Sequence, residues 1–315
     1  MQFDLDAIPR GRKRSLTLHG PVRWQVVVVR AAKPGKVTLA FGGIHGDEYE
    51  GPLAVHQVYR RLNPREMSGD FIGVPICNPP AFAAKQRATP QDGKNLARCF
   101  PGRPRGTVTD RIAHALHHQF IARCDFLIDM HSSGSRWTMP TLSGYTLGAP
   151  SINKLQHAAC LRFGAPVLWA SPHAPGRTLS SAHDLGIPGI YTETAGQNGC
   201  QGRDVDLYAN GVINVMVMLG VLPAKYFTRV ARPKLVIKEH GGYGDLDTSV
   251  KAKRDGLFVT RRPILARVKR GDLIGELFSP DGRLLQTFRA NRSGRLFLTR
   301  HASPILRGDL VFQIS

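Results

Sequence analysis

VTLAFGGIHGDE, residues 37–48, passes from apolar and β-branched residues into a glycine-rich loop. β-Branched and aromatic side chains pack well on a pleated surface, so residues 37–42 predict a strand. Beyond the loop, apolar residues recur near helical spacing over 49–62, which predicts a helix. The stretch is therefore typical of an α/β protein, and it places His45 and Glu48 in the loop between strand and helix.

The same alternation continues over the first two thirds of the chain. We expect further strands at 24–30, 71–77, 125–130, 167–170 and 187–193, and helices at 110–123 and 205–220. Strands that alternate with helices indicate βαβ crossovers and a mainly parallel sheet. The predicted fold class is thus α/β, with a mixed, mainly parallel sheet flanked by helices.

The character of the sequence changes after about residue 226. Short alternating stretches follow, separated by DG, GD, PDG and SG turns: LFVT, LIGELF, LQTFRA, RLFLT and LVFQI. This spacing predicts a small all-β domain. We therefore expect residues 1–225 to form the α/β domain and residues 226–315 to form a β-rich C-terminal domain.

Charge and composition narrow the possible partners. The chain has 43 Lys and Arg against 23 Asp and Glu, a net charge of +20 that attracts anions such as a carboxylate substrate or a nucleic acid. The basic residues are spread along the chain without an RNA-recognition, zinc-finger or basic-zipper pattern, so nucleic acid is not the expected partner. No apolar run is long enough to span a membrane and no signal peptide is recognisable, so we expect a cytoplasmic protein. A homo-oligomer is compatible with the sequence.

Polar residues that suit metal chemistry follow three of the predicted strands. His45 and Glu48 follow one strand, and His131 and Glu193 each directly follow another. Because ligands in α/β sheets bind beyond the carboxyl ends of the strands, we expect these side chains to lie together. Two imidazoles and one carboxylate form a zinc-ligand set, and a further carboxylate can act as a general base. The sequence therefore predicts one zinc ion held by His45, Glu48 and His131, with Glu193 as the base. Asp129 would either brace the His131 imidazole or make a structural hydrogen bond.

A longer ordered set of motifs runs through the same region. In chain order it comprises HGDE (45–48), NPPA (78–81), Arg87, DGKNLAR (92–98), FPG (100–102), DMH (129–131) and Glu193. Over about residues 36–220 this set resembles the succinylglutamate desuccinylase/aspartoacylase family, relatives of the zinc carboxypeptidases. The resemblance implies a zinc-carboxypeptidase-like fold with the same three zinc ligands and the same base. The tail is similar to the β-rich C-terminal domain of that family.

The resemblance also implies roles for residues of the loop at 78–107. Arg87 would polarise the scissile carbonyl, and Arg98 would hold a substrate carboxylate with Asn95 beside it. A planar guanidinium suits both tasks. Ala97 stands where the family has a second Asn that supports the arginine, and an alanine side chain donates no hydrogen bond. The amino acid in the substrate therefore stays open.

The expected function is that of a zinc-dependent amidohydrolase. It would remove the acyl group from a small N-acyl amino acid or related amide, by attack of a zinc-bound water that Glu193 activates. Two alternatives remain open: a zinc carboxypeptidase that acts on peptides, and a basic, non-catalytic nucleic-acid-binding protein on a relict hydrolase fold. A C-terminal domain that closes the cleft would favour small substrates over peptides. Salt-dependent DNA binding without hydrolysis would favour the last alternative.

Overall fold

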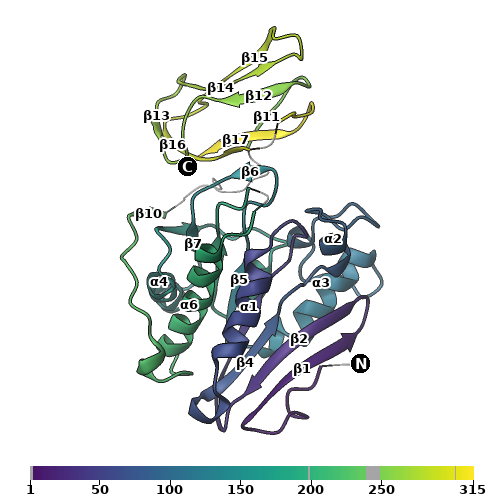
Figure 1. Ribbon diagram of the computed structural model, residues 1–315, viewed down its shortest axis with the longest axis vertical. Coiled ribbons are helices and arrows are strands. Elements are labelled where there is room, and N and C mark those ends of the chain that lie inside the picture. Colours follow the sequence, from purple (N-terminus) through teal and green to yellow (C-terminus); the bar gives the residue numbers. More distant parts are fainter. Residues whose placement is uncertain (1–2, 198, 239–248, 302) are drawn as a thin grey trace.

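The computed structural model describes residues 3–197, 199–238, 249–301 and 303–315, which form a large α/β part and a smaller β part (Figure 1). The strands of the large part are β1 (Arg12–His19), β2 (Arg23–Arg30), β3 (Lys33–Phe41), β4 (Ser68–Val74), β5 (Phe126–Met130), β7 (Leu142–Thr146), β8 (Val167–Ser171), β9 (Gly189–Glu193) and β10 (Leu235–Lys238). Its helices are α1 (Glu50–Arg61), α2 (Pro79–Ala83), α3 (Val108–Gln119), α4 (Pro150–Phe163), α5 (Thr178–His183) and α6 (Gly202–Met218), with 3-10 turns η1 (Pro64–Glu66), η2 (Leu96–Arg98), η3 (Ile121–Arg123) and η4 (Ala224–Tyr226). The strands of the smaller part are β11 (Val250–Lys251), β12 (Leu257–Thr260), β13 (Arg267–Val268), β14 (Leu273–Phe278), β15 (Leu284–Arg289), β16 (Gly294–Arg300) and β17 (Leu310–Ile314).

The large part is built on a nine-stranded sheet with the order β1-β2-β4-β3-β5-β9-β7-β8-β10. Strands β4, β3, β5 and β9 at its centre are parallel neighbours. β1 and β2 pair antiparallel with their neighbours, and β7 pairs antiparallel with β9 but parallel with β8. The sheet is therefore mixed and mainly parallel, which confirms the predicted fold class. Because β3, β5 and β9 run the same way side by side, the loops that follow them open at one edge of the sheet.

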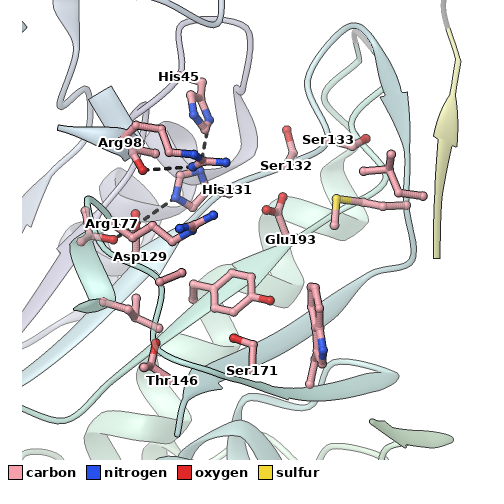
Figure 2. Close-up of a pocket in the computed structure, with 18 of the residues that line it drawn as sticks. His45, Arg98, Asp129, His131, Ser132, Ser133, Thr146, Ser171, Arg177 and Glu193 are labelled. Carbon is pink, nitrogen blue, oxygen red and sulfur yellow. Dashed lines mark hydrogen bonds and ion pairs between the residues drawn. The ribbon is translucent and has the colours of Figure 1, made fainter. Parts of the chain in front are cut away.

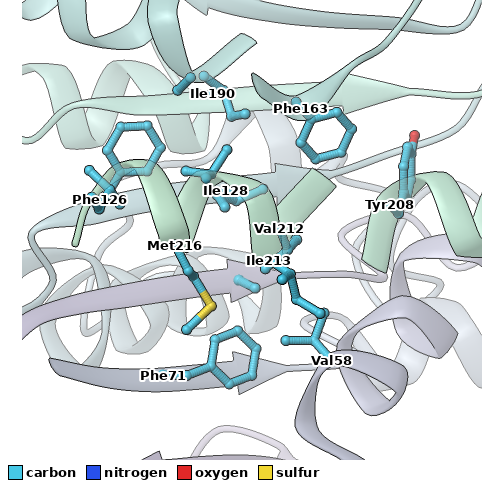
Figure 3. Packing of buried hydrophobic residues seen from close by; sticks show 14 of the residues in the cluster. Val58, Phe71, Phe126, Ile128, Phe163, Ile190, Tyr208, Val212, Ile213 and Met216 are labelled. Carbon is cyan, nitrogen blue, oxygen red and sulfur yellow. The ribbon is translucent and has the colours of Figure 1, made fainter. Parts of the chain in front are cut away.

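Helices cover both faces of this sheet. Side chains alternate along a strand, so Phe126 and Ile128 of β5 pack with α6 on one face, while Leu127 packs on the other face against α3 and α5. Figure 3 shows Val212, Ile213 and Met216 of α6 facing residues of the sheet, among them Phe71, Phe126 and Ile128. The sheet is thus fixed from both sides, and its strand ends are rigid supports for a site.

Several elements were not predicted from the sequence. β1, β7, α4 and α5 had no counterpart among the expected elements, and the loop expected at 78–107 contains α2 and η2. The helix expected at 110–123 begins two residues earlier and ends at Gln119. Within the described ranges, no helix is both long and apolar enough to cross a membrane.

The smaller part is attached to the large part through a short strand of the latter. β6 (Trp137–Thr138) lies in the loop between β5 and β7, and it pairs antiparallel with β16. The guanidinium of Arg300 in β16 lies 4.7 Å from the centroid of the Trp137 ring and forms an ion pair of 2.6 Å with Asp309. In Figure 1, β6 lies between the two parts. The loop that follows β5 thus contacts the smaller part directly, through the pairing of β6 with β16.

The boundary between the two parts remains a proposal. β10 lies beyond residue 226, yet it pairs with β8 at the edge of the large sheet. The first strand of the smaller part that the structure describes is β11, which begins at Val250. We therefore propose the two parts expected from the sequence, with β10 counted as an edge strand that the C-terminal segment adds to the large sheet.

Candidate metal centre and active-site cavity

Three buried side chains converge at the carboxyl ends of β3 and β5. The Nδ1 atom of His45 lies 2.6 Å from Oε1 of Glu48, and Nδ1 of His131 lies 3.0 Å from Oε2 of the same carboxylate. The two Nδ1 atoms are 3.3 Å apart. Only 3% of His45, 2% of Glu48 and 8% of His131 is exposed. The structure therefore brings together the three ligands predicted from the sequence.

The hydrogen bonds behind both imidazoles fix their tautomers. Oδ1 of Asn95 accepts from the Ala97 backbone N–H at 2.9 Å and lies 3.0 Å from Nε2 of His45, so the His45 Nε2 is the donor. Nε2 of His131 lies 2.9 Å from Oδ2 of Asp129, which only accepts when it is ionised. A neutral imidazole with a proton on Nε2 presents a lone pair at Nδ1. When both rings are neutral, both lone pairs are thus directed at the same point beside Glu48, as in metal sites with carboxylate-supported histidines.

The charges around this point favour a cation. Burial, followed by the nearby Arg87 guanidinium, lowers the pKa of His45 to about 4, so this ring is neutral at pH 7. Although burial opposes them, Asp129 and Glu48 raise the pKa of His131, because two carboxylates face one imidazole. Either a proton or a metal ion would supply the missing positive charge. Nitrogens about 3.3 Å apart also fit a tetrahedral ion with bonds of roughly 2.05 Å, so the donor set fits a metal.

A second group with suitable ligand atoms includes His173, which lines the same cavity. It consists of His173, His183 and Asp184, with 2.9 Å between His173 Nε2 and Asp184 Oδ1. The Asp184 side chain is 62% exposed, so water competes for each of these ligands. The buried group at His45, Glu48 and His131 is therefore the better candidate metal centre.

Glu193 ends β9, next to β5 in the sheet, and its side chain lies across the cavity from His131 (Figure 2). Its Oε2 atom is buried and has no hydrogen-bond partner among the described residues. Burial raises the pKa of Glu193 to about 8, while the positive charge of His131 opposes this rise. A carboxylate that faces a cavity without a protein partner can take a proton from a molecule bound there.

The loop between α2 and α3 brings two arginines to the cavity. Arg87 NH1 lies 3.2 Å from Oε1 of Glu48 and 3.3 Å from Nδ1 of His45. Arg98 lies in η2, which the Asn95 side chain caps, and both arginines line the cavity. Asn95 thus joins the loop to a candidate metal ligand, and we propose that it orients His45 in addition to the substrate-binding role expected from the sequence.

This loop is held in place by Asp110 in the first turn of α3. Its Oδ2 accepts hydrogen bonds from Lys94 Nζ at 2.9 Å, Arg103 NH2 at 2.8 Å and the Thr107 backbone N–H at 3.1 Å. Although burial opposes them, these partners lower the pKa of Asp110. Asp110 therefore stabilises the folded protein only when it is ionised.

We expect Asp110→Asn to lower the free energy of unfolding by about 1–2 kcal/mol at pH 7, as for the loss of a helix cap and its charged bonds. Because the folded-state pKa is depressed, the difference from wild type should shrink as the pH falls below the ordinary carboxyl range. Urea denaturation at pH 7 and in acid measures both effects. The exposed Asp281→Asn serves as the control, and an equal loss of stability in this control would contradict the assigned role of Asp110.

A cavity of about 360 Å³ opens over the metal centre. Both parts of the chain line it, since Phe297, Leu298 and Gln313 of the smaller part contribute side chains. The smaller part therefore contributes to the wall of the cavity. Cavities of this size suit small molecules.

Several residues that complete the site were not predicted from the sequence. Arg177 and Thr178 lie at the start of α5 and line the cavity, and the Thr178 hydroxyl donates a hydrogen bond to Asp129. Asp129 therefore braces the His131 ring while being held by Thr178. The Tyr208 hydroxyl of α6 donates to the backbone oxygen of His131. The sequence carries no motif for these residues, because only the fold brings them to the strand ends.

The chain is similar to known proteins over nearly its whole length. The chain is 28% identical over 308 residues to the N-alpha-acetyl-L-2,4-diaminobutyric acid deacetylase of Halomonas elongata, a match that covers 94% of this chain and 86% of the relative. The product-bound structure of the ectoine utilization protein EutE (DoeB) from Ruegeria pomeroyi is 28% identical with a TM-score of 0.85, covering 98% of this chain and 97% of that one.

A third relative and a family model agree with these matches. The succinylglutamate desuccinylase/aspartoacylase from Rhodobacter sphaeroides has a TM-score of 0.85 at 28% identity, covering 100% of this chain and 97% of that one. The family model of the succinylglutamate desuccinylase/aspartoacylase catalytic domain matches residues 34–219, close to the extent of the resemblance seen in the sequence. The chain therefore belongs to the succinylglutamate desuccinylase/aspartoacylase family.

Proposed function

We propose that this protein is a zinc-dependent amidohydrolase that removes the acyl group from a small N-acyl amino acid. The observation that carries the proposal is the convergence of two imidazole Nδ1 atoms and one carboxylate, with an unpartnered carboxylate across the same cavity. The relative from Halomonas elongata is named as a deacetylase of an N-acetyl amino acid. Family membership and this name support hydrolysis of an amide bond.

The residues of the chain divide the work of hydrolysis among them. His45, Glu48 and His131 would hold the zinc ion, which when bound supplies Lewis-acid polarisation of the substrate carbonyl and of water. Glu193 takes a proton from the attacking water as its oxygen bonds to the carbonyl carbon, and passes that proton to the leaving nitrogen as the C–N bond breaks. Arg87 donates a hydrogen bond to the carbonyl oxygen, whose negative charge increases in the transition state. Arg98 holds the substrate carboxylate.

The shape of the cavity favours this reaction over the alternatives. A carboxypeptidase must admit a polypeptide, whereas here β16 and β17 of the smaller part lie over the cavity and contribute to its wall. A non-catalytic protein that binds nucleic acid would not require a buried ligand set opposite a buried carboxylate. Small substrates are therefore the ones that the enclosed site suits.

A substrate screen tests the proposed function. Zinc-loaded protein would be incubated with acetyl, succinyl and longer N-acyl amino acids, and the release of primary amine would be measured. We expect turnover of at least one series. Cleavage of peptides alone would instead support a carboxypeptidase, and salt-dependent DNA binding without any hydrolysis would support the nucleic-acid-binding alternative.

Arg98→Ala should lower kcat/KM for substrates that carry a free carboxylate. We expect kcat/KM for N-acetylglycine to fall by the equivalent of about 1.5–3 kcal/mol, the value of a charge-assisted hydrogen bond, because Ala97 provides no second donor. N-acetylglycinamide, which has no anion to hold, should change little. The exposed Arg111→Ala is the matched control. Equal losses on the acid and the amide would leave Arg98 with a structural role only.

A further inference from the structure

One end of the cavity is aromatic and belongs to the junction of the two parts. Met139, Trp169, Tyr191 and Phe297 line it. The Trp169 ring centroid lies 4.4 Å from that of Phe297 and 6.3 Å from that of Tyr191. Trp169 and Phe297 are 4% and 1% exposed, and they belong to the apolar cluster that joins the two parts. A group of the substrate at this end would lie mainly against apolar side chains.

The charges that line the cavity leave no partner for a substrate cation. Three arginines, Arg87, Arg98 and Arg177, line it. Among the described residues that line it, the carboxylates are Asp129 and Glu193. Asp129 is bonded to His131 and Thr178, and Glu193 is the proposed base. A buried ammonium without a carboxylate is costly, so a cationic group is disfavoured here.

The aromatic rings do not offset this cost. A cation-binding cage needs open ring faces, whereas Trp169 and Phe297 pack against one another at an interplanar angle of 56°. The Nε1 atom of Trp169 is buried and has no hydrogen-bond partner among the described residues. An ammonium cannot satisfy this N–H, because it only donates. An uncharged substituent avoids the cost of burying a charge without a partner.

We propose that the aromatic end of the cavity selects an N-acyl amino acid with an uncharged, apolar substituent, located on either the side chain or the acyl group. The inference rests on the proposed deacylase function and names the substrate class of the same site. It separates this protein from the Halomonas elongata relative, which is named for a substrate that carries a second amino group. Trp169, Tyr191 and Phe297 are then residues that determine specificity.

Two matched substrate pairs test this inference in the zinc-loaded wild-type protein. The side-chain pair is N-acetylnorvaline and N-α-acetyl-2,4-diaminobutyrate, which differ by a methyl group in place of an ammonium. The acyl pair is N-butanoylglycine and N-(3-aminopropanoyl)glycine, which differ in the same way. We expect the neutral member of at least one pair to have a kcat/KM more than about tenfold higher, within the range of an apolar group in a fitted pocket. The pair that shows this preference identifies which substituent occupies the aromatic end.

A variant at the same end locates the preference. Ser171 lines the cavity and lies two residues after Trp169, so both side chains are on one face of β8. Figure 2 places Ser171 away from His45 and His131. Ser171→Asp should shift the preference toward the charged member of the same pair, while Ser171→Asn, of equal size but neutral, should not. Calorimetric binding of the products norvaline and 2,4-diaminobutyrate provides a readout independent of turnover for the side-chain pair.

Charged members that are hydrolysed as well as the neutral ones in both pairs would overturn the inference and leave the proposed function intact. An unchanged ratio in a folded Ser171→Asp variant would also overturn it, because the substituent would then bind elsewhere. If that variant does not fold, the two wild-type pairs decide alone. Absence of hydrolysis for all four compounds, while another N-acyl amino acid of the substrate screen is cleaved, would overturn this inference alone. Absence of hydrolysis for the whole screen would overturn the proposed function, and this inference with it.

Discussion

His131→Ala should bind little or no zinc and should lose nearly all hydrolase activity. The imidazole supplies one of three convergent ligand atoms, and it also connects Glu48 to Asp129. Loss of a residue that only supports a ligand costs about 10–100-fold in metal affinity. Loss of the ligand itself should cost more than about 100-fold, so the purified variant should contain far less than one zinc per chain by elemental analysis.

Two further variants separate ligand loss from general damage. Asp129→Asn retains the ligand but weakens its support, so its zinc affinity should lie between those of wild type and His131→Ala. His118→Ala removes an imidazole from the exposed face of α3 and should leave zinc content unchanged. Full zinc retention in His131→Ala would refute the proposed ligand set.

Glu193→Gln should keep its fold and its zinc but lose most of its turnover. The amide is nearly the same size as the carboxylate and cannot accept the proton of the attacking water. General base catalysis contributes about 10²–10⁴-fold, so we expect kcat to fall by that factor. Because Glu193 is not among the three convergent ligands, the zinc content of the variant should equal that of wild type.

The comparison variant for Glu193 is Glu276→Gln, a substitution of the same type in β14 outside the cavity lining. It should have wild-type turnover. Single-turnover kinetics with the enzyme in saturating excess over substrate would show whether the chemical step is the one that slows in Glu193→Gln. Near-normal turnover in a folded, zinc-loaded Glu193→Gln protein would assign Glu193 a structural role.

The strand ends that carry the site could be predicted because each has a strong local pattern. The buried runs before His131 and Glu193 are short and apolar, and the strand at 37–42 leads into the loop of His45. The structure places these strands side by side as β3, β5 and β9. These residues could therefore be predicted to lie together although they are far apart in the sequence, because parallel strands bring their carboxyl ends to one edge.

Elements without such a pattern could not be predicted. β1 (Arg12–His19) is a partly exposed edge strand with the sequence RKRSLTLH. Its charged residues interrupt the alternation of apolar and polar residues that would predict a strand. β6 has two residues, and its pairing with β16 joins positions more than 150 residues apart in the sequence. The aromatic wall formed by Trp169 and Phe297 depends on that pairing, because it brings the smaller part over the cavity. These features are properties of the tertiary fold.

The central claim, one zinc ion at His45, Glu48 and His131 that enables amide hydrolysis, is tested most directly by a zinc titration of metal-free wild-type protein. The rate of primary-amine release from an equimolar mixture of N-acetyl amino acids would be measured at each zinc-to-protein ratio. We predict that the rate rises in proportion to zinc and reaches its maximum at one zinc per chain. Zinc bound more weakly by the second group, His173, His183 and Asp184, should not raise the rate further. Full activity without zinc, or no activity with one zinc bound per chain, would contradict the claim.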